Sequence, residues 1–143
     1  MKTKAKTIHT PDVSKKREVL LFDAMVPAGF PSPAADYRQD KLDLNKHLIK
    51  HPAATFFVRV AGDSMIGAGI HCGDLLVVDR SLEPKNNNIV IAVVDGEMTV
   101  KRFRIHRNTI TLEPENENYP ACEITEDTRF EVWGVVTSVI HKL

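Results

Sequence analysis

A dipeptide between two runs of β-branched residues constrains the fold of this chain more than any other feature. Asp95-Gly96 is flanked by residues 89–94 (IVIAVV) and 98–105 (MTVKRFRI). Asp-Gly is favoured at the centre of a type I′ turn, whose twist matches that of two antiparallel strands. The sequence therefore predicts a tight β-hairpin over residues 89–105.

Further strands are predicted on both sides of this hairpin. Runs rich in β-branched, aromatic and other apolar residues occur at 55–60, 74–79, 109–112 and 130–140. The run at 130–140 is apolar on both alternations, which is typical of a central strand rather than an edge strand. Because no βαβ alternation occurs, we predict a mainly β body, built as a folded-over sheet or a partial barrel.

One short helix and an extended segment are predicted before these strands. Leu42, Leu44, Leu48 and Ile49 share one side of a helical pattern, with Asp43 as a possible N-cap and His51-Pro52 as the stop. Val19–Phe22 is a short apolar run that could pair as a strand or lie in a groove. Residues 26–35 contain three prolines and a glycine, which exclude a helix. We divide the chain into a flexible arm (1–28), a Pro-rich linker (29–41) and a β domain (42–143).

Composition excludes several classes of protein. In 143 residues Lys plus Arg balance Asp plus Glu at 19 each, which gives no reason to expect direct DNA binding. Residues 1–28 carry six Lys/Arg against three Asp/Glu, and a solvated, poorly ordered terminus is the simplest interpretation of them. Two cysteines, Cys72 and Cys122, supply no disulfide framework and no zinc site. No apolar run suits a signal peptide or a membrane span, so we expect a cytoplasmic protein with no cofactor and no metal.

Lys101 is the first residue that could do chemistry. In strand 98–105 it alternates with Arg102 and Arg104 and shares a face with Phe103 and Ile105. We expect the arginine face to be wet and Lys101 to point inward, where loss of hydration disfavours its ammonium form. A lysine that is neutral for this reason can act as a general base. The alternation alone leaves open a lysine that extends to the sheet edge or pairs with a carboxylate.

Ser64 is the second residue that could do chemistry. It follows a predicted strand that Gly62 breaks, in the sequence Val60-Ala61-Gly62-Asp63-Ser64-Met65. A serine on such a turn can expose its hydroxyl while adjacent backbone N–H groups converge on one point, as a nucleophile with an oxyanion hole requires. A turn serine bonded to its own backbone fits the local sequence equally well.

Several separated motifs, taken in order, resemble one known family. They are Gly-Asp-Ser-Met at 62–65, Gly-Asp with an apolar run at 73–79, Thr-Val-Lys at 99–101 on the hairpin, and Gly-Phe-Pro-Ser-Pro at 29–33. Together they resemble the LexA/UmuD family of self-cleaving serine peptidases, and most closely its UmuD-like SOS mutagenesis proteins. The resemblance covers the chain from about Phe22 onward and implies the LexA/signal-peptidase-like β fold. No helix-turn-helix pattern precedes it, so a LexA-type repressor is not expected.

The resemblance assigns roles to particular residues. It implies that Ser64 is the nucleophile, that Lys101 is its base, and that the backbone N–H groups of Asp63 and Ser64 form the oxyanion hole. The family cleaves an Ala-Gly or Cys-Gly bond just before its Phe-Pro-Ser-Pro segment, which is Ala28–Gly29 here. Two small residues let the backbone approach the nucleophile closely, and glycine tolerates a strained conformation.

The implied function is a serine endopeptidase that removes its own first 28 residues after DNA damage. The resemblance also implies that RecA–single-stranded DNA filaments act as co-activator and that the product, as a homodimer, joins a UmuC-like Y-family translesion polymerase. Three alternatives stay open: a non-catalytic β domain that binds a polymerase or RecA through a vestigial dyad, a signal-peptidase-like protease, and a DNA-binding regulator. The protease predicts a membrane anchor, and the regulator rests only on the basic arm.

Two other groups of residues are weaker candidates. His47 and His51 have a spacing that suits metal ligands on a helix, but Pro52 favours an ordinary helix terminus. Polar residues at 113–118 could bind a metal or a partner, and a solvated loop is the simpler interpretation.

Overall fold

The computed structural model describes residues 4–16, 18–22, 29 and 39–143 of the chain. It divides into two compact units, one of residues 1–11 and 51–143, here called the body, and one of residues 12–50, here called the small unit. Predicted site residue Ala28 lies outside the described residues, and Gly29 is described as an exposed bend.

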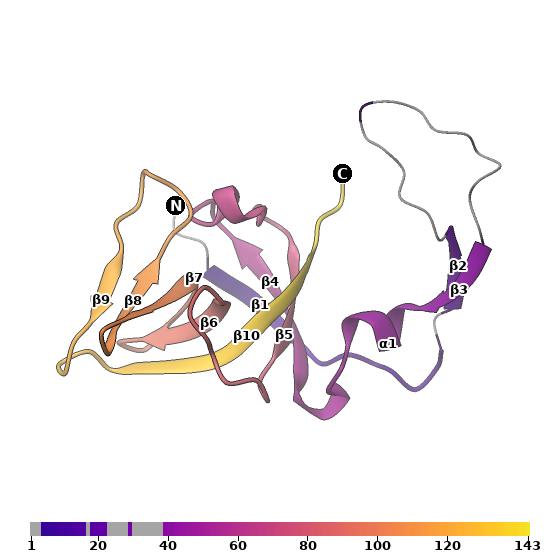
Figure 1. Ribbon diagram of the computed structural model, residues 1–143, viewed down its shortest axis with the longest axis horizontal. Coiled ribbons are helices and arrows are strands. Elements are labelled where there is room, and N and C mark those ends of the chain that lie inside the picture. Colours follow the sequence, from indigo (N-terminus) through magenta and orange to yellow (C-terminus); the bar gives the residue numbers. More distant parts are fainter. Residues whose placement is uncertain (1–3, 17, 23–28, 30–38) are drawn as a thin grey trace. The chain divides into compact units, whose positions relative to one another are not determined.

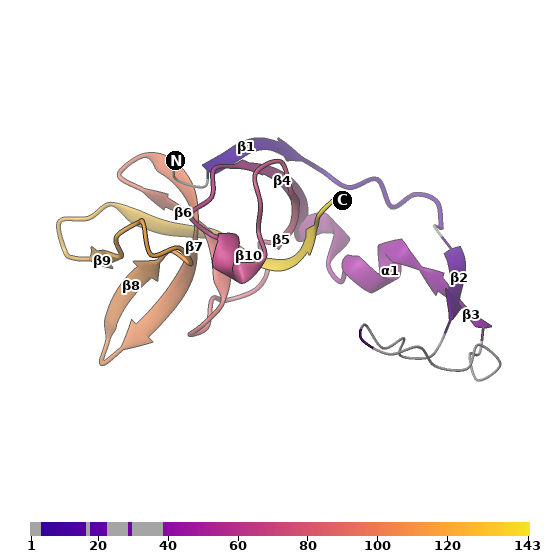
Figure 2. The ribbon, with the colours of Figure 1, turned by 90° about the horizontal axis from the view of Figure 1, so that it is seen from above.

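The body is built on one eight-stranded antiparallel sheet (Figure 1). Its strands follow in the order β1 (Lys4–His9), β4 (Thr55–Ala61), β5 (Leu75–Asp79), β10 (Phe130–Ile140), β6 (Ile89–Val94), β7 (Glu97–His106), β8 (Thr109–Glu113) and β9 (Cys122–Ile124). β1 lies along β4 at one edge and also contacts β7, so the sheet folds over on itself (Figure 2). This is the predicted mainly β, folded-over architecture, and that prediction is confirmed.

Two apolar clusters lie on opposite faces of the central strands. Along β6, Ile91 belongs to one cluster and its neighbours Val90 and Ala92 belong to the other, because successive side chains of a strand point to opposite faces. The first cluster joins β4, β5 and β7 to the turn after β4, and the second joins β7, β8 and β10. Residues that read as continuous apolar runs are therefore those of strands covered on both sides.

The predicted strands of the body are confirmed. Asp95 and Gly96 both have positive φ, at 48° and 83°, as a type I′ turn requires at its two central positions. β10 pairs with β5 on one side and β6 on the other, so it is central, as its apolar pattern predicted.

Two predictions about the body need correction. Residues 4–9 were expected to be a solvated, poorly ordered terminus, but they form β1; a polar edge strand beside β4 shows no apolar period that would announce it. The arginine face of β7 was expected to be wet, yet Val100 on that face is fully buried in the first cluster. That face is covered because the turn after β4 packs on it.

The small unit holds a two-stranded antiparallel sheet and one helical turn. β2 (Glu18–Phe22) pairs with β3 (Gln39–Asp43), which confirms a strand at Val19–Phe22. α1 (Leu44–Leu48) begins after Asp43, whose side chain accepts a hydrogen bond from the backbone N–H of Asn45 at 3.0 Å. Asp43 is therefore the predicted N-cap, and Leu42, the first residue of the leucine pattern, lies before it in β3.

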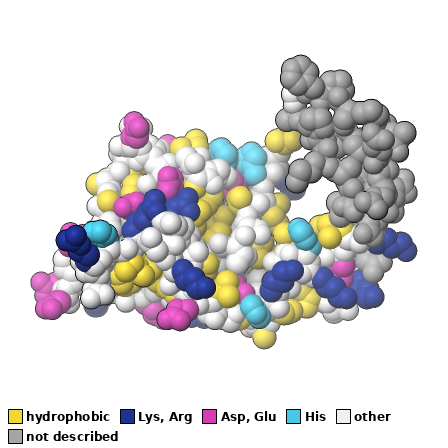
Figure 3. Space-filling view, viewed as in Figure 1, with side chains coloured by type: hydrophobic (Ala, Val, Ile, Leu, Met, Phe, Trp, Pro, Cys, Tyr) yellow, Lys and Arg dark blue, Asp and Glu magenta, His cyan; other side chains and the backbone are white. Residues whose placement is uncertain are grey.

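Basic and acidic side chains are interspersed on the face drawn in Figure 3, in keeping with the balanced composition. Of the helices in the described ranges, none has the length and apolar character needed to cross a membrane.

Candidate functional site

Ser64 lies in the turn that follows β4, and this turn packs against the apolar core. Gly62, with φ 93°, ends the strand in a conformation that glycine adopts without strain. Met65 packs fully buried in the first apolar cluster and pulls the turn onto the sheet. A short 3-10 helix over Ile66–Ala68 follows. As a result the side chain of Ser64 is 0% exposed.

Lys101 reaches this turn from β7. It pairs across the hairpin with Val90 and shares the face of Phe103, as the alternation predicted, and it is only 6% exposed. Its Nζ lies 3.1 Å from Ser64 Oγ, although the two residues are 37 positions apart in the chain. The two residues that the sequence singled out are therefore brought within hydrogen-bonding distance inside the protein.

Burial of the pair favours the form of lysine that can act as a base toward Ser64. Desolvation disfavours an ammonium ion and favours the neutral amine, which can accept a proton from a hydroxyl at hydrogen-bonding distance. Serine in turn needs such a neighbour, because its hydroxyl is a weak nucleophile without a base. The predicted oxyanion donors, the backbone N–H groups of Asp63 and Ser64, lie in the same turn; their role stays a prediction.

The polar loop after β8 holds the Ser64 turn in place. The backbone N–H of Glu115 donates to the carbonyl of Ser64 at 2.8 Å, and the N–H of Gly67 donates to the carbonyl of Glu115 at 2.8 Å. A Cβ on Gly67 would lie 2.7 Å from that carbonyl oxygen, so only glycine allows this approach. The Asn116 side chain donates to the carbonyl of Asp63 at 2.9 Å.

Tyr119 adds a side-chain contact to the same turn. Its hydroxyl donates to Asp63 Oδ1 at 2.5 Å. This hydrogen bond lowers the pKa of Asp63 and raises the pKa of Tyr119, because it stabilises the ionised carboxylate and the protonated phenol. Asp63 is thus held as an anion by the loop.

Two ion pairs fix the loop to the hairpin that carries Lys101. Arg102 Nε lies 2.9 Å from Glu115, and Arg104 Nε lies 2.9 Å from Glu113. Residues 113–118 were expected to be a solvated polar loop, but together with Tyr119 they connect β7 to the Ser64 turn. Sequence reasoning missed Glu115, Asn116 and Tyr119 because their partners are far away along the chain; the only local signal was the density of hydrogen-bonding side chains.

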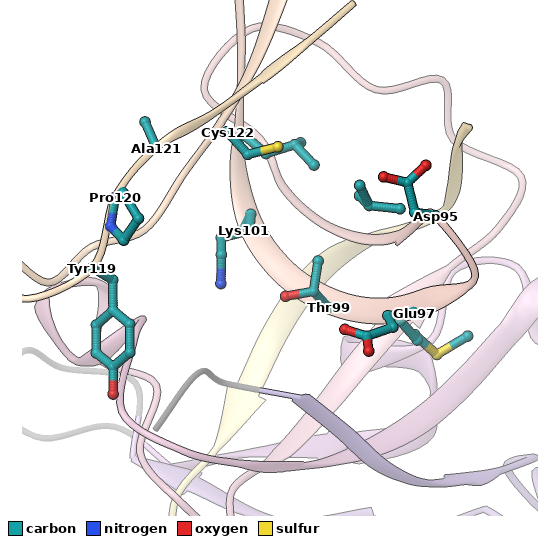
Figure 4. A pocket seen from close by; sticks show the side chains of 11 residues that line it. Asp95, Glu97, Thr99, Lys101, Tyr119, Pro120, Ala121 and Cys122 are labelled. Atoms are coloured by element: carbon teal, nitrogen blue, oxygen red, sulfur yellow. The ribbon is translucent and has the colours of Figure 1, made fainter. Parts of the chain in front are cut away.

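A hollow of about 390 Å³ opens beside Lys101. Figure 4 shows Lys101 directed between Tyr119 and Pro120 on one side and Thr99 and Glu97 on the other. The other residues that line the hollow include apolar and small side chains: Val94, Met98, Leu112 and Ala121. A hollow of this kind, with a buried amine in its wall, suits an extended peptide segment with small side chains.

Comparison with known proteins decides the family. The model of the Peptidase S24-like family matches residues 20–137. This chain belongs to the Peptidase S24-like family. Its match spans β2 to β10 and so includes the Ser64 turn, the hairpin with Lys101 and the loop over residues 113–119.

Individual relatives agree with this family assignment. Protein SamA of Salmonella typhimurium strain LT2 is 52% identical over 122 residues, covering 85% of this chain and 84% of SamA. Protein MucA of Escherichia coli is 40% identical over 135 residues, covering 94% and 92%. A LexA repressor of Clostridium kluyveri is 37% identical over 120 residues, covering 82% of this chain and 59% of the repressor. The resemblance drawn from the motifs is confirmed.

Proposed function

We propose that this S24-like chain is a self-cleaving serine endopeptidase of the SOS response, with Ser64 as nucleophile and Lys101 as base. The observation that carries the proposal is the buried 3.1 Å contact between Lys101 Nζ and Ser64 Oγ beside a hollow. Family membership supports the reaction class, and the likeness to a LexA repressor supports a chain that acts on itself.

The proposed reaction proceeds through an ester. Neutral Lys101 takes the hydroxyl proton as Ser64 Oγ attacks the carbonyl carbon of Ala28, and the backbone N–H groups of Asp63 and Ser64 stabilise the oxyanion. The Ala28–Gly29 bond then breaks, and Lys101 returns the proton to the leaving amine of Gly29. Water, deprotonated by Lys101, hydrolyses the ester and releases residues 1–28. No oxidant, metal or cofactor enters this scheme.

Tethering explains how such a site works without a strong substrate grip. Because the bond lies in the same chain, effective concentration replaces binding affinity. The rate then depends on how often the segment with Ala28 and Gly29 enters the hollow and on the fraction of neutral Lys101. A RecA–single-stranded DNA filament would act as co-activator by raising one of these two quantities.

The product beginning at Gly29 would act as a homodimer and as a subunit of a UmuC-like Y-family translesion polymerase, in the cytoplasm. These partners come from the family resemblance, and the relatives SamA and MucA support the comparison through identity over most of their length. Direct DNA binding is not proposed, because Lys plus Arg balance Asp plus Glu over the chain at 19 each.

The proposal is tested by weighing the products. The purified chain is incubated at alkaline pH, and separately with RecA, ATP and single-stranded DNA, and is then analysed by intact-mass spectrometry. We expect a fragment that begins at Gly29, absent in Ser64→Ala and in Lys101→Ala. An intact chain under both conditions would favour a non-catalytic domain with a vestigial dyad, and a cut elsewhere that survives Ser64→Ala would refute the assignment of the site.

A further inference from the structure

Three side chains that can bind metal meet where β5 begins and β10 ends. His71 and Asp74 lie in the turn before β5, and His141 directly follows β10. The sheet register brings them together, since Ile140 pairs with Leu75 and the next residues along the antiparallel pair are His141 and Asp74. The sequence does not indicate this cluster, because 67 positions separate Asp74 from His141.

The donor atoms of these side chains converge. One ligand atom from each residue lies within 4.8 Å of the other two. His71 Nδ1 lies 3.6 Å from Asp74 Oδ2, and His141 Nδ1 lies 2.5 Å from Asp74 Oδ1. The two imidazole rings lie side by side, with centroids 4.6 Å apart. Both nitrogen donors therefore face the same carboxylate.

An ion pair alone accounts for only part of this arrangement. A hydrogen bond between Asp74 and His141 would by itself anchor the end of the chain. It leaves His71 Nδ1 buried and, among the described residues, without a hydrogen-bond partner. Buried polar atoms normally have a partner, so an unsatisfied nitrogen that faces a carboxylate needs an explanation. A cation between them supplies one.

We propose that His71, Asp74 and His141 bind a first-row divalent transition ion of the Zn²⁺ type. Two imidazole nitrogens and one carboxylate form a donor set that such ions prefer, whereas Mg²⁺ and Ca²⁺ prefer oxygen ligands alone. The 3.6 Å separation of His71 Nδ1 and Asp74 Oδ2 is close to the edge of a tetrahedral site, about 3.3 Å for bonds near 2.0 Å.

One adjustment is needed for binding, and the fold permits it. His141 Nδ1, which is hydrogen-bonded to Asp74 Oδ1, must give up that bond and turn toward an ion held by His71 Nδ1 and Asp74 Oδ2. His141 lies just beyond β10, and its side chain is 42% exposed, so it can shift without disturbing the sheet. A fourth position is available to water or to Cys72, an exposed free cysteine that lines the same 210 Å³ hollow as Asp74 and His141.

Binding here would join three parts of the body. The turn that carries His71 and Asp74 is already bonded to β4, since Gly73 N–H donates to the Val60 carbonyl at 2.9 Å and Val60 N–H donates to the Asp74 carbonyl at 3.1 Å. The ion would clamp this turn and the end of β10 together. The consequence is a body that unfolds at a higher temperature when the ion is bound.

The proposal is tested by titrating the full chain with Zn²⁺ in a calorimeter. We expect one ion per chain, and an affinity at least about tenfold weaker in His71→Ala and in His141→Ala. His106→Ala is the matched control, because that histidine is exposed at the end of β7, and it should bind like the parent. Zn²⁺ should also raise the unfolding midpoint of the parent and of the control, and not that of the two variants.

Two results would overturn the site. One is the absence of Zn²⁺ binding by the parent chain, and the other is binding that neither His71→Ala nor His141→Ala weakens. Unfolding without metal verifies that each variant is folded, and His71→Ala is expected to fold because it removes an unsatisfied nitrogen. The Co²⁺ spectra of the parent chain and of Cys72→Ser are then compared to identify the fourth ligand. A thiolate gives a charge-transfer band that water does not, so a band present in the parent and lost in Cys72→Ser identifies Cys72.

Discussion

The body and the small unit differ in how much apolar packing stabilises them. The body buries two apolar clusters around an eight-stranded sheet, with Ser64 and Lys101 inside it. Among its described residues, the small unit has a two-stranded ladder and a helix of five residues, and no residue of that helix is buried. An isolated two-stranded sheet and a single helical turn are each marginal in water.

This difference supports the proposal that the chain is both enzyme and substrate. A buried amine and hydroxyl keep their 3.1 Å contact only where packing over-determines their positions. A peptide bond that must enter a hollow has to leave its local structure first, and local opening costs less than global unfolding where few apolar contacts are lost. The predicted bond, Ala28–Gly29, lies in the chain between β2 and β3 of the small unit.

The largest expected contrast is in stability. Ile91→Ala removes a fully buried side chain from the first cluster and should lower the free energy of unfolding by about 2–5 kcal/mol. Leu44→Ala at the start of α1, where the leucine is 40% exposed, should change it by less than about 0.5 kcal/mol. Denaturant unfolding in a Ser64→Ala background measures both. Equal losses would contradict the contrast between the two regions.

A substitution at the predicted bond should separate cleavage from stability. Gly29→Val places a branched side chain where the backbone must approach the nucleophile, and we expect cleavage to slow by about 100-fold or more. Unfolding of the body should be unchanged. Ala35→Val is the control, since it enlarges a residue of the same segment away from the bond. A cleavage rate for Gly29→Val equal to that of the control would remove Ala28–Gly29 as the target.

The loop over residues 113–119 makes a prediction of intermediate size. Asn116→Ala removes the hydrogen bond to the Asp63 carbonyl and should slow cleavage about tenfold by loosening the Ser64 turn. Asn118→Ala is matched in chemistry and position, and its backbone N–H, which donates to Asn116, is retained. Time courses of the Gly29 product distinguish them. If the two variants cleave alike, the loop does not position the turn.

The smallest effect is expected at Asp79, within the body. Its pKa is lowered, because hydrogen bonds from Ser81 and His51 outweigh the opposing effect of burial. A carboxylate with a lowered pKa stabilises the fold above its unfolded pKa of about 3.9 and loses that contribution as pH falls through its folded pKa. Asp79→Asn should therefore cost about 1 kcal/mol at pH 7 and less below pH 4.

Unfolding of Asp79→Asn is measured across this pH range beside Asp127→Asn, which alters an exposed aspartate in a turn before β10. The control should show no such pH-dependent difference from the parent. A constant cost of Asp79→Asn down to pH 2 would mean that packing, and not the charge, accounts for the loss.

Most of the body could be predicted because its strands carry their own signal. The Asp95-Gly96 turn and the doubly apolar run of β10 indicate a hairpin and a central strand before any partner is known. β1 could not be predicted in this way, since its Lys- and Thr-rich sequence becomes a strand only beside β4. The leucine pattern alone did not show where α1 begins, because it runs on into β3, but the Asp43 cap did.

The candidate site likewise has features that the sequence predicts and features that it does not. Strand alternation predicted that Lys101 points inward, and Gly62 predicted the turn that carries Ser64, although that turn buries the serine, which was expected to expose its hydroxyl. Their 3.1 Å contact is a long-range property that only the motif order suggested. The hydrogen bonds from Glu115, Asn116 and Tyr119 were not predictable, because polar residues in a loop look the same whether water or another turn is their partner.

The central claim is that buried Lys101 acts as a neutral base toward Ser64, and the pH dependence of self-cleavage tests it most directly. The rate of appearance of the Gly29 fragment is followed from pH 7 to pH 10 with the unmodified chain. While Lys101 is mostly protonated, the rate should rise about tenfold per pH unit and then level off as the amine becomes neutral. A rate that stays flat from pH 7 to pH 10 would contradict the account.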